Sequence, residues 1–415
     1  MKALLLCASH NDLGLIRSLR KIGYEIICTG NRRGLAGEKY VDEYIQMDYS
    51  DQERVLALAR EREVDAIVQC CNDYGVYTAA YVAEKLGLPG YDPYETILTL
   101  HNKDRFKAFA EEYGILTCNT QCFGNMEEAL TQAEAMDLPI IVKPSDASAG
   151  NGIHKIEKRE EARGYIQDAF EYSRNGRIVI EPFLEGSQHG FCTFLKDKKV
   201  IVYCSNDEYS MINPYRVEID TYPASDHEDV HKILISQIEK MADILNLKDG
   251  IFHLQYINVN GKPYILEVMR RILGNMYSVP STLLNGFDWD YWETRCRCGL
   301  SIDQIPLSCR EEGFYAYKTL VATKNGTIKK IELLPEYEKY VIGKHMIRKP
   351  GDRIDNYKSQ PVGFLFMMFS SKEEMLRVLI KNYANGMVVT DETFAGKGAA
   401  DYGKNTGNQN INALL

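Results

Sequence analysis

The N-terminal part of the chain alternates short apolar runs with segments of helical spacing. The apolar runs Lys2–Ala8, Glu25–Thr29 and Val64–Cys70 predict buried strands. Amphipathic segments of helical spacing lie between and after these runs, at Leu13–Ile22, Asp51–Glu63 and Val76–Leu86. Because strands and helices take turns, the pattern predicts a parallel sheet with helical crossovers over residues 1–95.

Polar side chains follow two of the predicted strands at their carboxyl ends. Ser9-His10-Asn11 comes after the first strand, and Asn72-Asp73-Tyr74 comes after Val64–Cys70. Open parallel sheets bind ligands at the carboxyl ends of their strands. We therefore expect His10, Asn11, Asn72 and Asp73 to contact a substrate. No GxGxxG follows the first strand, so a dinucleotide site is not expected.

The remaining pattern mixes helices and strands without an internal repeat. Lys103–Tyr113 predicts a helix, and Asn260-Gly261 between two apolar runs predicts a tight hairpin. A region with strands at Phe314–Thr323 and Val362–Phe369 and a helix at Lys372–Tyr383 follows. We divide the chain into residues 1–95, 96–305 with a lid at about 116–178, 306–395, and a flexible tail at 396–415.

Composition narrows the class of protein. Apolar residues make up 45% and charged residues 26% of the 415 positions, which is typical of a globular protein. The formal net charge of −9 argues against a nucleic-acid partner. No apolar run reaches the ~20 residues that span a bilayer, and the run Ala3–Ala8 is too short for a signal peptide. The eleven cysteines show no zinc-like pairs, so we expect reduced thiols in a cytoplasmic protein.

Two lysines occupy positions suited to phosphate binding. Lys103 opens a predicted helix within His-Asn-Lys-Asp-Arg-Phe-Lys. Lys143 ends an apolar strand and precedes the small-residue loop Ser145–Gly152. Main-chain amides of such a loop can approach a polyphosphate while a lysine neutralises its charge. Taken singly, Lys103 also fits a solvated basic face, and the loop also fits a hairpin turn.

Two further features lie downstream. The segment Val179–His189 is extended around Glu181, and Gln188 can reach a ribose. Gln255 and Glu267 lie on the two strands of the predicted hairpin, where paired oxygen ligands suit magnesium. Alone, the first feature also fits an edge strand, and the second fits a cross-strand polar pair followed by surface arginines.

Together, in this order, the four features resemble the ATP-grasp superfamily, which includes carbamoyl phosphate synthetase and biotin carboxylase. The resemblance covers about residues 1–300 and implies an α/β protein with α+β ATP-binding lobes and an N-terminal parallel-sheet domain. It implies that ATP and Mg²⁺ or Mn²⁺ are bound, the metal by Gln255 and Glu267. It assigns catalytic roles to Arg271 and Lys143. The ATP-binding residues that it implies are Lys103, Lys143, Ser148, Gly150, Gly152, Glu181, Phe183, Leu184, Gln188 and His189.

Two positions depart from the family pattern. Met269 stands where the family often has a metal-binding asparagine, and Gln255 stands where it usually has an acid. Carbamoyl phosphate synthetase also has glutamine at the second of these positions. We therefore expect the metal site to depend mainly on Glu267.

The resemblance implies a carboxylate–amine ligase that makes an acyl phosphate, releases ADP and forms an amide. Its partners would be a small carboxylate and a small amine, and the protein would be a homodimer. Arg270 and Asn275 are further expected substrate contacts. Two alternatives stay open: a carboxylase of a purine precursor acting through carboxyphosphate, although the Pro-Arg-Pro-His run of such relatives is absent, and an ATP-binding regulatory protein.

Overall fold

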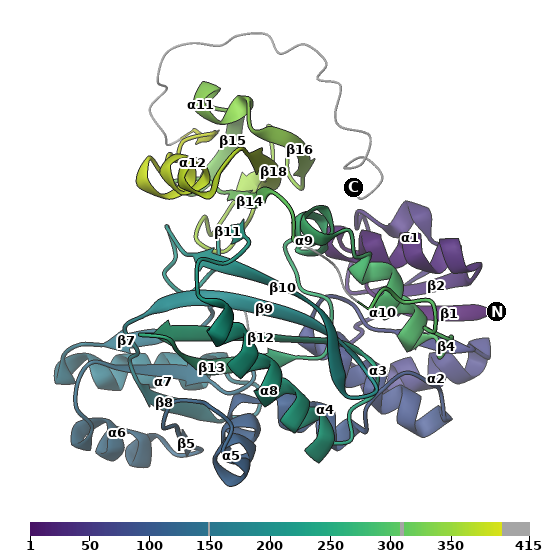
Figure 1. The fold of residues 1–415 in the computed structure, drawn as a ribbon, viewed down its shortest axis with the longest axis horizontal. Coiled ribbons are helices and arrows are strands. Elements are labelled where there is room, and N and C mark those ends of the chain that lie inside the picture. The colour runs from purple at the N-terminus through teal and green to yellow at the C-terminus, as the bar shows by residue number, and fades with distance from the viewer. Residues whose placement is uncertain (148–149, 308–310, 392–415) are drawn as a thin grey trace. The chain divides into compact units, whose positions relative to one another are not determined.

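A computed structural model describes residues 1–147, 150–307 and 311–391, and its elements are drawn in Figure 1. The predicted tail at 396–415 and the predicted ATP contact Ser148 lie outside these residues. The chain divides into two compact units. The first unit comprises Met1–Ser205, Ser225–Leu273 and Trp289–Ser308. The second unit comprises Asn206–Ala224, Gly274–Asp288 and Cys309–Leu415.

The first unit begins with the predicted parallel sheet, which is confirmed. Its strands run in the order β3-β2-β1-β4, and every pairing is parallel. The buried faces pack against helices through a core that includes Leu4, Ile67 and Val76. The strands are β1 (Lys2–Leu6), β2 (Glu25–Gly30), β3 (Glu43–Gln46) and β4 (Ala66–Val68), and the helices that follow them are α1 (Leu13–Ile22), α2 (Gln52–Arg62) and α3 (Asp73–Leu86).

A second sheet of the first unit is antiparallel, with the strand order β5-β8-β6-β7. Two helices, α6 (Met126–Ala135) and α7 (Ala162–Tyr172), share a buried apolar core with it. This sheet carries Lys143 on β6 and Glu181 on β8. Its strands are β5 (Gln121–Phe123), β6 (Ile140–Pro144), β7 (His154–Ile156) and β8 (Ile178–Pro182).

A third set of strands in the first unit pairs in the order β13-β12-β9-β10. Its core is formed with α5 (Lys103–Tyr113) and α8 (Glu228–Ile244). The predicted hairpin is confirmed: Asn260 and Gly261 both have positive φ, at 52° and 85°. The strands are β9 (Ser187–Lys196), β10 (Lys199–Tyr209), β12 (Gly250–Val259) and β13 (Lys262–Met269); the remaining helices of this unit are α4 (Tyr94–His101) and α10 (Trp289–Arg297).

The second unit contains the last residues of β10 paired with β11 (Ile219–Tyr222), followed by β14, β18 and β16. One face of this sheet forms an apolar core with α12 (Lys372–Leu376). The predicted helix Lys372–Tyr383 is α12 continued by a π-helical turn at Arg377–Lys381. The other elements are α9 (Ser278–Asn285), β14 (Phe314–Leu320), β15 (Gly326–Ile331), α11 (Pro335–Glu338), β16 (Val341–Met346), β17 (Arg353–Ile354), β18 (Gly363–Phe369) and β19 (Val388–Thr390).

The second unit draws segments 206–224 and 274–288 from the range that the four-part division assigned to one domain, and that division stays a prediction. Over the described residues, none of the helices has the combined length and apolar character of a membrane span.

Candidate functional site

Lys103 is held in the first unit by a carboxylate and by the small-residue loop. Its Nζ lies 2.9 Å from Glu267 Oε2 and donates to the carbonyl of Ala147 at 3.0 Å. Its main-chain N–H donates to the carbonyl of Ser145 at 2.9 Å. The start of α5 is therefore connected both to the hairpin glutamate on β13 and to the loop after β6.

Lys143 takes part in a buried charge network on the antiparallel sheet β5-β8-β6-β7. Its Nζ donates to Glu181 Oε2 at 2.6 Å. The other oxygen, Oε1, lies 3.1 Å from Lys107 Nζ and accepts from the Thr120 hydroxyl at 2.8 Å. Lys107 Nζ also donates to the carbonyl of Ile265 on β13 at 3.1 Å. The network thus joins β6, β8, α5 and β13.

The pKa values in this network follow from the pairing. Burial alone would raise the pKa of Glu181, but Lys107 and Lys143 outweigh it and hold that pKa well below its usual range. Burial opposes the charge of Lys143 as well, yet the Glu181 carboxylate raises its pKa above the ordinary value. Both groups are therefore ionised at neutral pH, and Lys143 keeps a full positive charge.

The loop after β6 is anchored at its start. The main-chain N–H of Ser145 donates to the carbonyl of Arg177 at 3.0 Å, and Asp146 Oδ2 accepts from the N–H of Asn175 at 2.9 Å. Gly150 and Gly152 have φ values of 75° and 65°, which favour glycine. The predicted contacts of these glycines with ATP, and the closure of the loop as a lid, stay predictions.

The hairpin brings Gln255 and Glu267 directly opposite each other, as expected. The register shifts immediately after Gln255, so the bulge lies next to this pair. Met269, also on β13, is 7% exposed and offers no oxygen. Among the described residues, no three His, Cys, Asp or Glu side chains cluster as a metal site.

Strand alternation separates the next two expected ATP contacts. Gln188 pairs with Ile257 and His189 with Tyr256, so the two side chains point to opposite faces of the sheet. His189 is buried and stacks on Tyr256 on the face that packs against α8. Gln188 shares the face of Gln255, so it is the better placed of the two. The ATP contact of His189 stays a prediction that this geometry does not favour.

Phe183 and Leu184 follow β8 directly. The N–H of Phe183 donates to the carbonyl of Pro139 at 3.0 Å, and Lys155 Nζ lies 4.4 Å from the centre of the Phe183 ring. The side chain of the preceding Glu181 is occupied by lysines, so any adenine contact there involves the main chain.

Arg271 and Arg270 differ sharply in surroundings. Arg270 is 1% exposed, pairs with Asp92 at 2.9 Å and donates to the carbonyls of Ile251 and Lys248 at 2.6 Å each. Because these contacts occupy its guanidinium, Arg270 has a structural role, and its predicted substrate contact is not favoured. Arg271 Nε donates to Asp73 Oδ1 at 2.7 Å and its Nη1 donates to the carbonyl of Ile272 at 3.2 Å, so it makes fewer contacts than Arg270.

His101 also contacts the Asp73 carboxylate that pairs with Arg271. The main-chain N–H of Arg270 donates to His101 Nε2 at 3.0 Å, so the proton is on Nδ1, which lies 3.1 Å from Asp73 Oδ1. Burial lowers the pKa of His101, and Asp73 offsets this only in part. Burial would raise the pKa of Asp73, but Arg271 and His101 hold it well below its usual range.

The polar ends of β1 and β4 meet, as expected for parallel strands. The Sγ of Cys71 donates to the carbonyl of Asn11 at 3.2 Å, and His10 lies next to Asn11 in a short 3-10 helix at His10–Asp12. The Asn72 side chain caps α3 by accepting from the N–H of Tyr74 at 3.0 Å. Substrate roles for these residues stay predictions.

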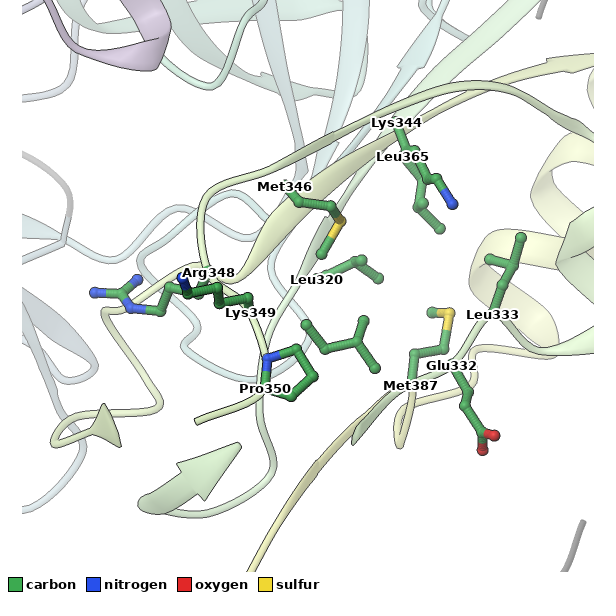
Figure 2. Close-up of a pocket in the computed structure, with 11 residues that line it drawn as sticks. Leu320, Glu332, Leu333, Lys344, Met346, Arg348, Lys349, Pro350, Leu365 and Met387 are labelled. Atoms are coloured by element: carbon green, nitrogen blue, oxygen red, sulfur yellow. The ribbon is translucent and has the colours of Figure 1, made fainter. Parts of the chain in front are cut away.

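The last expected substrate contact, Asn275, lies in the second unit, where its Nδ2 donates to the Tyr317 hydroxyl at 3.3 Å. This unit also contains a pocket of about 250 Å³ (Figure 2). Its centre is apolar, while the Arg348 guanidinium and the Glu332 carboxylate lie at its edge. No residue expected at the functional site lines the pocket. Its lining consists of Leu320, Ile331, Glu332, Leu333, Lys344, Met346, Arg348, Lys349, Pro350, Leu365 and Met387.

Comparisons with known proteins show related sequences and folds. Residues 101–214 match the family model for the ATP-grasp (A) domain of phosphoribosylglycinamide synthetase. The N-terminal section of the carbamoyl phosphate synthase large chain from Methanopyrus kandleri is 23% identical over 316 residues, 73% of this chain and 56% of the relative. The large chain from Clostridium beijerinckii is 21% identical over 62% of this chain and 24% of the relative. The chain thus spans about half or less of these relatives' length.

Solved structures share the fold. L-amino acid ligase from Bacillus licheniformis has a TM-score of 0.78 at 18% identity, covering 94% of this chain and 99% of that one. Phosphoribosylglycinamide synthetase from Anaerococcus prevotii has a TM-score of 0.73 at 18% identity, with the same coverage. The biotin carboxylase domain of Hydrogenobacter thermophilus 2-oxoglutarate carboxylase, solved as a dimer with MgADP and bicarbonate, has a TM-score of 0.73 at 18% identity over 89% of this chain and 86% of that one. Together the comparisons confirm the resemblance to the ATP-grasp superfamily seen in the motifs, through the family model over residues 101–214 and through the fold that the solved structures share.

Three residues of the site were not expected from the sequence. They are Lys107, His101 and Asp92, which position Glu181, Asp73 and Arg270. Lys107 and His101 stand within or beside the basic run around Lys103, which was the only signal that could have indicated them.

Proposed function

We propose that the chain is an ATP- and magnesium-dependent ligase that activates a small carboxylate for attack by an amine. The observation that carries the proposal is the pairing of Lys103 with Glu267, beside Gln255, in the same unit as the Lys143–Glu181 network. Lysines that bind phosphate groups and oxygen side chains that bind a cation recur in proteins that transfer a phosphoryl group from ATP.

Gln255 and Glu267 fit magnesium because this ion needs only one or two protein oxygens when nucleotide phosphates and water complete its shell. The side chain of Glu267 is 29% exposed and already faces a cation, the Lys103 ammonium. When bound, magnesium would neutralise charge on the transferring phosphates. The loss of an asparagine ligand at Met269 makes Glu267 the main protein ligand.

The other residues act by binding and orientation. Lys143, fixed as a cation by Glu181, would hold ATP phosphates, and Lys103 would do the same from the start of α5. Arg271, oriented by Asp73, would stabilise the acyl phosphate and the oxyanion that forms when the amine attacks. The amine expels phosphate and leaves an amide, so the products are the amide, ADP and phosphate.

The decisive experiment is ADP release screened over pairs of small carboxylates and amines. We expect release that needs magnesium and both substrates, with a mass-detectable amide product. Release that instead needs bicarbonate and an amine alone would favour a carboxylase acting through carboxyphosphate. ATP binding without release for any pair would favour a regulatory role and would contradict the ligase proposal.

A further inference from the structure

One face of the sheet in the second unit carries a row of buried polar side chains. Glu208 on β10 is the register neighbour of Asp220 on β11, and Asp220 is the neighbour of Tyr317 on β14. Neighbours directly across strands point to the same face, so the three side chains lie side by side. The opposite face, with Ala316 and Met367, forms the apolar core of the unit.

Among the residues that the structure describes, Asp220 has no counter-charge. It is 2% exposed, and its Oδ2 accepts from the Tyr222 hydroxyl at 3.4 Å, while Oδ1 has no hydrogen-bond partner within the described ranges. No lysine, arginine or histidine of the described ranges forms an ion pair with it. Burying a carboxylate without a cation is costly, so natural proteins pair such groups or use them to bind something.

The pKa of Asp220 also indicates that a cation would be favourable at this position. Burial raises the pKa of Asp220 well above its usual range, and the neighbouring Glu208 raises it further. The neighbouring polar side chains of Tyr317, Tyr222 and Asn206 lower this pKa only in part. A cation placed here would relieve both the burial cost and the repulsion between the two carboxylates.

Asn206 supplies a second, independent indication of a ligand. It is fully buried, and its Oδ1 accepts from the Tyr277 hydroxyl at 2.8 Å, whereas Nδ2 has no hydrogen-bond partner in the described part of the chain. Buried amide donors are almost always satisfied. The face therefore presents an unused acceptor on Asp220 and an unused donor on Asn206, beside the Tyr317 hydroxyl.

We infer that Asn206, Glu208, Asp220 and Tyr317 form a binding site for the ammonium group of a small amine that also carries an oxygen acceptor. Asp220 and Glu208 accept from the ammonium, and the Asn206 amide donates to the ligand oxygen. The inference rests on the proposed function in one respect only: the amine would be the nucleophilic substrate. Binding itself does not depend on ATP.

Calorimetry with the ATP-free protein tests the site. The probes are L-alanine, glycinamide and ethanolamine, with ethylene glycol and tetramethylammonium as comparators that lack an N–H cation. We expect at least one amine to bind and neither comparator to do so. Asp220→Asn, which keeps the side-chain shape, should weaken that binding about tenfold or more because a charge-assisted contact is lost.

Asp207→Asn is the matched control. Asp207 is also buried on β10, but its register neighbour is Thr221, and it lies 3.7 Å from Lys372, so it points to the opposite face. Its substitution should change amine affinity less than twofold. If Asp220→Asn does not fold, Tyr317→Phe replaces it, with an expected weakening of about threefold to tenfold. No amine binding to the wild type, or full binding by the variant tested, would overturn the site.

Proton release separates a binding role from a structural one. Because the pKa of Asp220 is raised without ligand, an ammonium ion should lower it, release a proton and bind more tightly as pH rises. The binding enthalpy should therefore vary with the ionisation enthalpy of the buffer in the wild type and not in Asp220→Asn. An unchanged enthalpy would count against the site, whereas failure of ADP release alone would count against the ligase proposal. The other titratable or charged groups around the site are Glu208, Tyr222, Tyr277, Tyr317 and, near Tyr317, Arg216.

Discussion

At the scale of single residues, Glu181 shows how a sequence position can be recognised while its partners stay hidden. Glu181 was expected to contact ATP, yet both of its carboxylate oxygens face lysines. Lys107 could not be identified as one of them, because it stands among basic residues that equally fit an exposed helix face. Its contacts with Glu181 and Ile265 join positions that are distant in the chain, and only the folded sheets bring them together.

Glu181 should give the protein a pH-dependent stability. Its pKa is lower in the folded chain than the ordinary ~4.3, so its contribution is complete above that pH and is lost as pH falls further. Glu181→Gln should cost about 3 kcal/mol at pH 7, because two lysines stay buried without a counter-charge. Below pH ~4.3, the free energy of unfolding of Glu181→Gln should also fall less steeply with decreasing pH than that of the wild type.

Urea unfolding at pH 7 and pH 3.5 measures both effects. Glu157→Gln is the control, since Glu157 pairs with Lys155 on the exposed surface and should change little. Equal stability of Glu181→Gln and the wild type at pH 7 would contradict the network.

Glu267 carries a separate prediction about turnover. Glu267→Gln keeps the shape of the side chain but removes the charge that a magnesium ion needs. We expect kcat for ADP release to fall on the order of a hundredfold or more, with the fold intact. Glu239→Gln breaks a comparable lysine–glutamate pair, at 2.8 Å from Lys199, and should leave kcat unchanged. Wild-type turnover in Glu267→Gln would show that the metal ligand is elsewhere.

At the scale of elements, the sequence predicted best where periodicity and local turn signals agreed. The parallel sheet and the Asn260-Gly261 hairpin are confirmed by the strand pairing. Strand β3 was missed because Glu43–Gln46 is only partly buried and lacks a clear apolar pattern. The buried ammonium site proposed on β10, β11 and β14 was also missed, because only the register between strands that are distant in the sequence brings its residues together.

The hairpin turn should be sensitive to the backbone freedom of Gly261. A Cβ there would meet no atom within 4 Å, but the φ of 85° is strained for any other residue except asparagine or aspartate. Gly261→Ala should therefore destabilise the fold by about 1 kcal/mol.

Gly164→Ala is the matched control, because Gly164 also has open space around it but lies within helix α7. This change should stabilise the fold by about 0.5–1 kcal/mol. Chemical denaturation of both variants measures the difference, and a loss of stability of the same size in both would show that φ is not the cause.

At the scale of the whole molecule, the two units have separate cores and separate proposed ligands. The ATP and magnesium residues lie in the first unit, and the ammonium residues lie in the second. A ligand that binds only the folded state stabilises it by about 2.7 kcal/mol at one hundred times its Kd. Each ligand should slow exchange most in the unit that binds it.

Hydrogen–deuterium exchange followed by mass spectrometry tests this separation. ATP with magnesium should slow exchange in β6, β8 and the start of α5, and a binding amine should slow it in β11 and β14. The controls are the amine added to Asp220→Asn and ATP with magnesium added to Glu267→Gln. Protection of the same peptides by both ligands would contradict the assignment of two sites.

The contact between Lys103 and Glu267 has a consequence for the sequence of ligand entry. While the ammonium of Lys103 stays at Glu267, a free magnesium ion must displace another cation before it gains its main protein ligand. A nucleotide that arrives with its metal instead offers phosphate oxygens to Lys103 and the metal to Glu267 in one exchange of partners. In steady-state kinetics, the metal–nucleotide complex should then behave as a single substrate. The protein should also purify without bound magnesium.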